Sequence, residues 1–215
     1  MIPFVGSTRK KDWVSELHRR QVGRIFQRYE IRDNSPLYPG ERWAFDNGAY
    51  SDWTNCREFP AKEFRTSVDR VMKFQHRPFF AVTPDRPGHK DSLEFSYFWI
   101  RQLPSTLNWY LAVQDGMSER DVREALDSGW FSGLFIGGTD KFKHTAPEWV
   151  DLAHTHGKPC HYGRASTPKK MRAAWRVGCD SFDTSFPLWT KERFWEFLRV
   201  TTVDHYEEPS EVFRW

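Results

Sequence analysis

Short apolar runs alternate with helical patterns along almost the whole chain, and this alternation limits the possible folds more than any other feature. The runs predict eight strands, at Ile2–Val5, Arg24–Tyr29, Arg42–Phe45, Phe79–Thr83, Trp109–Val113, Gly133–Ile136, Cys160–Tyr162 and Ser181–Thr184. The helical patterns predict seven helices, at Asp12–Arg20, Ala61–Gln75, Ser92–Gln102, Glu119–Ser128, Pro147–His156, Pro168–Val177 and Lys191–Val200. Only the link between the second and third strands, which holds Pro36 and Pro39, is expected to lack a helix. Strands and helices that alternate with short connections predict a parallel sheet.

Chain length limits how such a sheet can close. The chain has 215 residues, and a (β/α)₈ barrel needs about 250, with about 200 as the lower limit. Eight strand–helix units favour a closed barrel over an open, doubly wound sheet. We therefore predict a single-domain α/β protein, a compact (β/α)₈ TIM barrel over residues 1–203, followed by a C-terminal tail over residues 204–215.

Capping residues support two of these helices. Ser166 and Thr167 are N-cap candidates before Pro168, and Gly178 suits the position after the end of that helix. Ser118 is followed three residues later by Asp121, as in a capping box, and Gly129 suits the end of the same helix.

Composition narrows the class of protein. Charged residues make up 28% of the chain and hydrophobic residues 39%, and no run reaches the ~20 apolar residues of a membrane span. The N-terminus has no basic segment before an apolar stretch, and the three cysteines are scattered, so we expect a cytoplasmic protein without disulfides. We expect no metal and no cofactor. The net charge of +3 permits a polyanionic partner, and the 17% of aromatic residues can fill a core or stack on bases.

Polar and glycine residues recur where the predicted strands end. These segments are Asp46-Asn47-Gly48-Ala49-Tyr50, Asp85-Arg86, Gln114-Asp115-Gly116, Gly137-Gly138-Thr139, Gly163-Arg164 and Asp183-Thr184-Ser185. In a parallel barrel the carboxyl ends of the strands meet at one mouth, where carboxylates can act as nucleophile or proton carrier. Taken singly, Asp46-Asn47-Gly48 could be only a turn, Asp85 a loop residue and Asp183 a cap. Their recurrence at one end of successive strands favours a site.

This series of segments resembles that of the tRNA-guanine transglycosylases and their shorter DpdA-like relatives, which insert 7-deazaguanines into the DNA of phages and bacteria. Asp46-Asn47-Gly48-Ala49-Tyr50 is similar to the family's Asp-Ser-Gly-Gly-Phe/Tyr, and Val113-Gln114-Asp115-Gly116 to its Val-Gln-Gly. Gly137-Gly138 matches the family's Gly-Gly, and Phe182–Pro187 resembles its Phe-Asp-Cys-x-x-Pro. The order agrees over roughly two thirds of the chain.

Departures from the family pattern bear on the substrate. The tRNA enzymes carry a zinc site of three Cys and one His near the C-terminus, but after Pro187 this chain has no cysteine and only His205. We therefore expect no zinc subdomain, which favours DNA over tRNA. Asn47 and Ala49 replace the family's Ser and Gly, and Gly163-Arg164-Ala165-Ser166 follows its Gly-Val-Gly only loosely.

The resemblance implies a base exchange that replaces guanine in DNA with a 7-deazaguanine (preQ0-type) base through a covalent glycosyl–aspartate. Asp183 would be the nucleophile and Asp46 would handle protons at the base. Alternation along the strand favours Asp183 over Asp180, because Asp183 shares a face with Ser181. The implied base-binding residues are Asn47, Tyr50, Asp85, Gln114, Gly137, Gly138 and Tyr162, with Tyr50 and Tyr162 on either side of the base. The target nucleotide must be flipped out or lie on an unpaired strand.

Basic residues near the seventh strand suit phosphate contacts. They are Arg164, Lys169, Lys170 and Arg172, although a solvated helix face explains them equally well. Three other functions remain open: an N-glycosylase, a tRNA-guanine transglycosylase lacking zinc, and a catalytically silent barrel that binds nucleic acid. The sequence does not indicate an oligomeric state.

Overall fold

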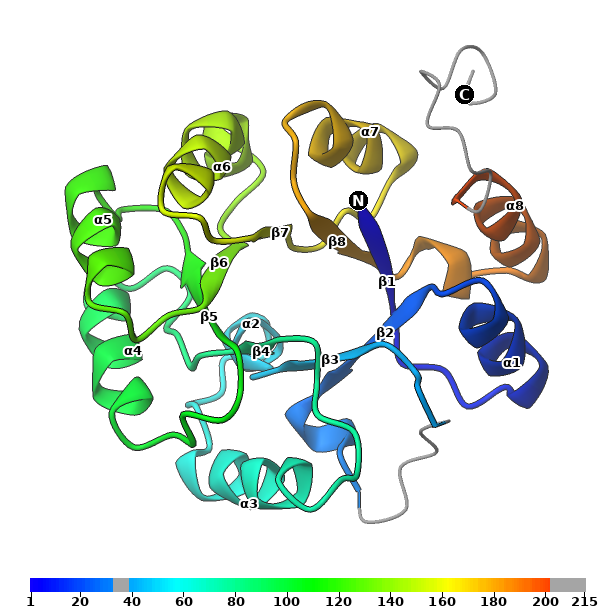
Figure 1. The fold of residues 1–215 in the computed structure, drawn as a ribbon, viewed down its shortest axis with the longest axis horizontal. Helices are drawn as coiled ribbons and strands as arrows, with labels where there is room; N and C mark the ends of the chain where they lie inside the picture. The colour runs from blue at the N-terminus through cyan, green and yellow to red at the C-terminus, as the bar shows by residue number, and fades with distance from the viewer. Residues whose placement is uncertain (33–38, 202–215) are drawn as a thin grey trace.

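The protein is a closed barrel of eight parallel strands, and this confirms the predicted fold. The structure, a computed structural model, describes residues 1–32 and 39–201. The strands follow the chain order around the barrel, and β8 pairs with β1 to close it (Figure 1). They are β1 (Ile2–Gly6), β2 (Gly23–Gln27), β3 (Trp43–Asp46), β4 (Ala81–Val82), β5 (Trp109–Val113), β6 (Gly133–Ile136), β7 (Cys160–Tyr162) and β8 (Ser181–Thr184).

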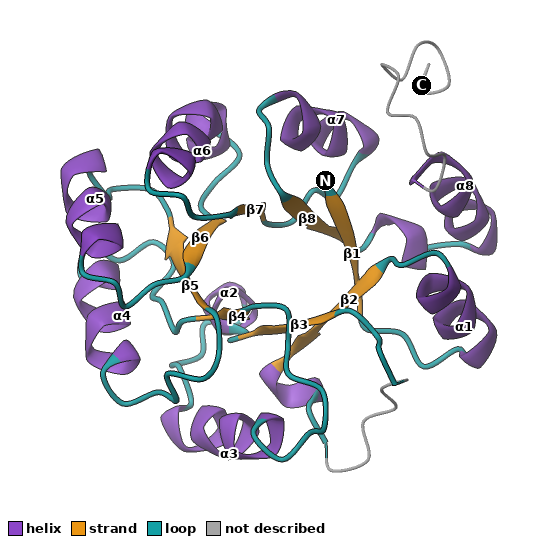
Figure 2. Cartoon of the chain, viewed as in Figure 1, coloured by secondary structure: helices purple, strands orange, loops and turns teal. Residues whose placement is uncertain are grey.

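Helices form the outer ring of the molecule (Figure 2). The α-helices are α1 (Lys11–Arg19), α2 (Ala49–Thr54), α3 (Ala61–Val71), α4 (Ser92–Ile100), α5 (Glu119–Asp127), α6 (Ala146–Thr155), α7 (Pro168–Arg176) and α8 (Lys191–Thr201). Three short 3₁₀ helices follow strands: η1 (Arg28–Glu30), η2 (Phe142–Thr145) and η3 (Phe186–Leu188). No helix in the described part of the chain is long and apolar enough to cross a membrane.

Alternation along the strands separates two buried clusters. Inward side chains, such as Phe4, Phe80 and Tyr110, fill the barrel, whereas their neighbours, such as Val5 and Ala81, pack against the helices. This two-residue period decides which side chains at the strand ends face the mouth.

The core also holds an ion pair. The guanidinium of Arg24 on β2 contacts the carboxylate of Glu41, and both side chains are almost completely buried. Arg24 also donates to the backbone carbonyl oxygen of Thr8 at 2.9 Å. The pair therefore ties β2 to the segment before β3, and Arg24 also binds the segment after β1.

The predicted caps of two helices, at Thr167 and Ser118, are confirmed. The side chain of Thr167 accepts a hydrogen bond from the backbone N–H of Lys170 at the start of α7, and Ser118 accepts one from Asp121 at the start of α5. Gly129 and Gly178, just after α5 and α7, both have positive φ angles, which glycine adopts at little cost.

The structure corrects several predicted elements. The fourth strand is shorter than predicted, and α3 ends at Val71 rather than at Gln75. The second strand ends at Gln27, because residues 28–30 turn into η1 and bury Arg28. The link from β2 to β3 is therefore not helix-free. Helix α2, which was not predicted, starts directly after Gly48 and lies inside the outer ring of helices (Figure 1). Residues 33–38 and the predicted tail, 204–215, lie outside the described residues.

Candidate functional site

Asp183 lies near the carboxyl end of β8, inside the mouth of the barrel. Its side chain is 15% exposed. Its Oδ1 atom accepts hydrogen bonds from the His161 ring and from the backbone N–H of Arg164, both at 3.0 Å. Within the described part of the chain, Oδ2 has no hydrogen-bond donor. One carboxylate oxygen is therefore held in place while the other stays available.

His161 on β7 is completely buried inside the barrel. Its ring stacks on Phe135, with centroids 4.9 Å apart, and its Nδ1 atom lies 2.8 Å from the Ser181 hydroxyl. Burial lowers the pKa of His161, so the ring is neutral at pH 7. Because a carboxylate only accepts hydrogen bonds, the ring proton belongs on Nε2 and the Ser181 hydroxyl donates to Nδ1. Sequence reasoning missed this contact, although strict alternation along β7 and β8 would have placed both side chains in the barrel.

Asp46 ends β3 and faces the same mouth. Its Oδ1 atom accepts a hydrogen bond from the backbone N–H of Gly48 at 3.3 Å. Burial raises the pKa of Asp46 to about 7; the Gly48 bond opposes this shift, and the charges of Asp183 and Asp85 add to it. Asp46 is therefore a carboxyl group that can both give and take a proton near neutral pH.

A hydrogen-bonded network surrounds Asp85 beside this pair. The Asn47 amide donates to Asp85 at 2.8 Å, and the Gln114 amide donates to it at 3.2 Å. Burial raises the pKa of Asp85 to about 6, against the lowering effect of these bonds. Gln114 also accepts from the backbone N–H of Gly88 at 3.2 Å. The structure thus brings Asp85 and Gln114 together, and their predicted contacts with the edge of a base stay predictions.

Asn47 has a structural role in this network. Its amide nitrogen also donates to the carbonyl oxygen of Thr83 at 2.8 Å, and its oxygen accepts from the backbone N–H of Ala49 at 2.6 Å. The side chain therefore links the ends of β3 and β4 and starts α2. Its polar atoms are bonded within the protein, and its predicted contact with a base stays a prediction.

Gly137 and Gly138 form a tight turn after β6. The N–H of Gly137 continues the strand pairing to the carbonyl oxygen of Val113 at 2.9 Å, so it is not free for a ligand. Gly138 has a φ of +67°, and a Cβ there would lie 2.6 Å from Phe142. Only glycine fits this position, so the backbone conformation requires Gly138 whether or not it also contacts a base.

Arg164 spans the mouth. Its guanidinium donates to the carbonyl oxygen of Gly138 and lies 3.7 Å from the centre of the Tyr50 ring. Its φ of 54° is unusual for a residue other than glycine and marks a conformation that the surrounding contacts must enforce. The side chain contacts Gly138 and Tyr50, and the phosphate role predicted for Arg164 stays a prediction.

Tyr162 does not lie opposite Tyr50. It is the outward neighbour of His161 and packs in the cluster between the barrel and the helices, with the Lys143 ammonium 4.9 Å from its ring centre. Tyr50 is exposed. The predicted sandwich of a base between the two rings is wrong, because β7 points Tyr162 away from the barrel interior.

Lys143 on η2 was also missed by sequence reasoning. It is buried, and its ammonium donates to the carbonyl oxygen of Gly163, directly before Arg164. Burial lowers the pKa of Lys143 to about 7, and the nearby charge of Arg164 adds to this effect. Nothing in the local sequence indicates that this lysine would be buried.

The other predicted basic residues lie around α7. Lys170 forms an ion pair with Asp140 at 2.8 Å, Lys169 is exposed, and Arg172 is half-buried. Their predicted phosphate contacts stay predictions. In the described residues, no group of three or more His, Cys, Asp or Glu side chains is arranged to hold a metal ion.

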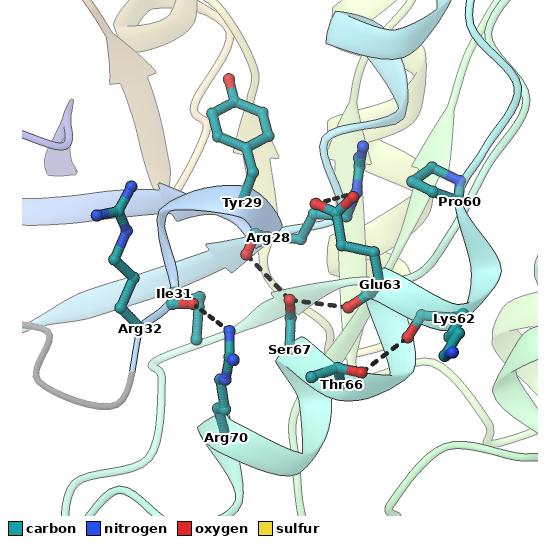
Figure 3. A pocket seen from close by; sticks show the side chains of 10 residues that line it. All are labelled: Arg28, Tyr29, Ile31, Arg32, Pro60, Lys62, Glu63, Thr66, Ser67 and Arg70. Atoms are coloured by element: carbon teal, nitrogen blue, oxygen red, sulfur yellow. Dashed lines mark hydrogen bonds and ion pairs between the residues drawn. The ribbon is translucent and has the colours of Figure 1, made fainter.

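A cleft outside the mouth holds about 530 Å³ between η1 and α3 (Figure 3). Its floor is tied together by Ser67, whose hydroxyl donates to the carbonyl oxygens of Arg28 and Glu63. Arg28 and Glu63 also form an ion pair at 3.5 Å. None of the acidic residues of the mouth lines this cleft, so we place the candidate site at Asp46 and Asp183.

The comparisons with known proteins add no assignment. No protein-family model matches the chain, and no curated protein matches it.

Proposed function

We propose that the protein is a base-exchange transglycosylase that replaces guanine in DNA with a 7-deazaguanine base. The observation that carries this proposal is the pair of carboxyl groups in one mouth: Asp183 held through one oxygen, and Asp46 with a pKa of about 7. These properties suit a nucleophile and a proton carrier. The motif series from Asp46 to Pro187 supports the same assignment.

Asp183 would act as the nucleophile. Its free Oδ2 atom attacks C1′ of the target nucleotide, and the bond from C1′ to the guanine nitrogen breaks with its electron pair on guanine. This leaves a covalent glycosyl–aspartate, as in retaining glycosidases. The hydrogen bonds from His161 and Arg164 to Oδ1 hold the carboxylate in position during the attack.

Asp46 would carry the proton in both halves of the exchange. In its neutral form it donates a proton to the departing guanine, and the resulting carboxylate accepts the ring proton of the incoming 7-deazaguanine. The nitrogen of that base then attacks C1′ and releases Asp183. A pKa near 7 makes both forms accessible at neutral pH.

Asp85 and Gln114 would recognise the edge of the base. The carboxyl of Asp85 offers a donor when neutral and an acceptor when ionised. The Gln114 amide donates to Asp85 and to Ser92 and accepts from Gly88, so it would exchange one of these bonds for a bond to the base. Buried groups of this kind reject ligands that leave them unpaired.

Trapping the covalent intermediate tests the proposal. Wild-type protein is incubated with guanine-containing DNA and denatured during turnover, and a protein–DNA adduct is sought as a shifted band. Asp183→Asn keeps the shape but removes the nucleophilic charge, so it should form no adduct and lose turnover by several orders of magnitude. Incorporation of a labelled 7-deazaguanine into DNA is measured in parallel.

Asp180→Asn is the matched control. Asp180 bonds to the backbone N–H of Cys160 at 2.7 Å and to His154 at 2.9 Å, at the opposite end of β8. Its variant should retain adduct formation. An adduct that persists in Asp183→Asn would place the nucleophile elsewhere, and the absence of any adduct in wild type would favour the silent barrel. Release of guanine without incorporation of a new base would make the protein an N-glycosylase, and preferential labelling of tRNA would exclude DNA as the substrate.

A further inference from the structure

Exposed aromatic side chains cluster on one arc of the mouth. Tyr29 follows β2, Tyr50 and Trp53 lie on α2 after β3, and Trp189 follows β8. Because β8, β1, β2 and β3 are consecutive in the closed barrel, these residues occupy one continuous side of the rim. We call Tyr29, Tyr50, Trp53 and Trp189 the aromatic arc. The loops from β4 to α4, β5 to α5, β6 to η2 and β7 to α7, all of which the structure describes, carry no large exposed hydrophobic side chain.

Contacts within the protein hold the aromatic arc in place. The Trp53 indole lies 5.7 Å from the Tyr50 ring and packs so closely on Gly88 that a Cβ there would be 3.3 Å away. The guanidinium of Arg193 lies 4.9 Å from Trp189. Tyr29 lies near enough to Asp46 for the charge of Asp46 to raise its pKa, although burial is the larger cause. Tyr29 also lines the cleft between η1 and α3 (Figure 3).

Cationic side chains lie on the other side of the mouth. Lys141 and Lys169 are exposed in the segments after β6 and β7, and Arg164 bridges from this side to Tyr50. Asp140, in the segment after β6, pairs with Lys170, and Asp115, in the segment after β5, accepts hydrogen bonds from Thr139 and lies near Lys141. One side of the rim thus offers flat apolar surfaces, and the other offers positive charge.

We propose that this rim binds single-stranded DNA, with bases next to the target nucleotide stacked on the aromatic arc and phosphates beside Lys141 and Lys169. The inference rests on the proposed function, which places the target nucleotide between Asp46 and Asp183. Proteins that bind unpaired strands combine stacking platforms with a basic surface. In a duplex each base is already stacked on its neighbours, so the aromatic arc would have no base faces to contact.

Binding measurements with no exchangeable base present test the inference. A labelled single-stranded DNA of about 12 nucleotides, a length typical of such sites, is compared by fluorescence anisotropy with the same sequence as a duplex. Wild type should prefer the single strand. Trp53→Ala and Trp189→Ala should each weaken that binding by about 5- to 100-fold, since stacking on one aromatic side chain contributes that much.

Trp130→Ala is the matched control. Trp130 is similarly exposed but precedes β6, at the opposite end of the barrel, so its loss should not change binding. Thermal melting checks that each variant folds, and Trp53→Phe, which keeps an aromatic surface, should retain most of the affinity. Equal or tighter binding of the duplex, or equal losses in Trp130→Ala and Trp189→Ala, would overturn the inference. Tighter binding of the matching RNA strand would overturn the assignment to DNA.

The outcomes separate this inference from the proposed function. If the single strand binds as expected but no base is ever exchanged, the surface stands and the transglycosylase proposal fails. If exchange proceeds equally well on duplex DNA in Trp53→Ala and Trp189→Ala, the transglycosylase proposal stands and the surface inference fails.

Discussion

The ring of His161 is completely buried and lies 3.0 Å from the carboxylate of Asp183, so an inward side chain of β7 holds the proposed nucleophile of β8. The same ring takes a second hydrogen bond from Ser181, on the same strand as Asp183. Three inward residues on two neighbouring strands therefore form one chain of hydrogen bonds. Because His161 is neutral at pH 7, it orients Asp183 without cancelling its charge.

Replacing His161 should slow the chemical step. His161→Phe keeps an aromatic ring against Phe135 but removes one of two donors to Asp183. A hydrogen bond to a charged group contributes about 1.5–3 kcal/mol, so adduct formation should slow by roughly 10- to 100-fold, with little change in DNA affinity. Single-turnover trapping measures the rate. His161→Gln, which retains a donor, should recover part of it, and an unchanged rate in His161→Phe would remove His161 from the mechanism.

Asp46 should give the two halves of the exchange opposite pH dependences. Its pKa of about 7 means that the neutral acid dominates below pH 7 and the carboxylate above it. Guanine release, which needs the acid, should therefore slow above about pH 7, whereas attack by the incoming base, which needs the carboxylate, should slow below it. Measuring guanine release and decay of the isolated adduct across pH tests this. Matching profiles for both steps would contradict a proton-carrying role for Asp46.

The raised pKa of Asp46 should also lower the stability of the folded protein at high pH. Since its pKa is about 7 in the folded protein against 3.8 for an ordinary aspartate, the folded state binds more protons than the unfolded state between these pH values, and stability falls as pH rises through them. Asp46→Asn should therefore stabilise the protein by roughly 2–4 kcal/mol at pH 8 and by much less near pH 4. Urea unfolding at both pH values measures the difference, and an equal effect at both would refute the raised pKa.

Two substitutions of Arg164 distinguish the effect of losing its side-chain contacts from the effect of its positive φ angle. Arg164→Ala and Arg164→Gly both remove the contacts to Tyr50 and Gly138, but only glycine adopts a φ of 54° freely. Arg164→Gly should therefore be about 1 kcal/mol more stable than Arg164→Ala in urea unfolding. Because both retain the N–H that donates to Asp183, both should still form the adduct. Equal stability of the two variants would argue against strain at this position.

The buried ion pair of Arg24 and Glu41 should contribute more to the free energy of unfolding than an ion pair on the surface. Glu41→Gln removes the carboxylate charge that contacts the buried Arg24 guanidinium, so it should destabilise the fold by about 3–5 kcal/mol. Glu16 pairs with Arg19 on the surface of α1, and Glu16→Gln should cost at most about 1 kcal/mol. Urea unfolding compares the two. A small effect of Glu41→Gln would mean that the Arg24 charge is compensated by other groups.

The strand and helix order follows from the sequence because it depends on local patterns. Apolar runs of strand length, the capping residues Ser118 and Thr167 and the terminal glycines Gly129 and Gly178 each act within a few residues. Alternation along the last strand likewise suffices to put Asp183 and Ser181 on one face. The closing of eight such units into a barrel then places Asp46, Asp85, Gln114 and Asp183 at one mouth.

Tertiary structure alone decided what each of these residues contacts. Asn47 resembled a ligand-binding residue, but its amide links β3, β4 and α2. Tyr162 resembled a stacking partner for a base, but β7 directs its ring outwards and directs His161 to Asp183 instead. Lys143 gave no local signal of burial, because its pairing with the Gly163 carbonyl exists only once η2 packs beneath the β7 loop. Hydrogen-bond partners and desolvation depend on residues far apart in the chain, so no local pattern encodes them.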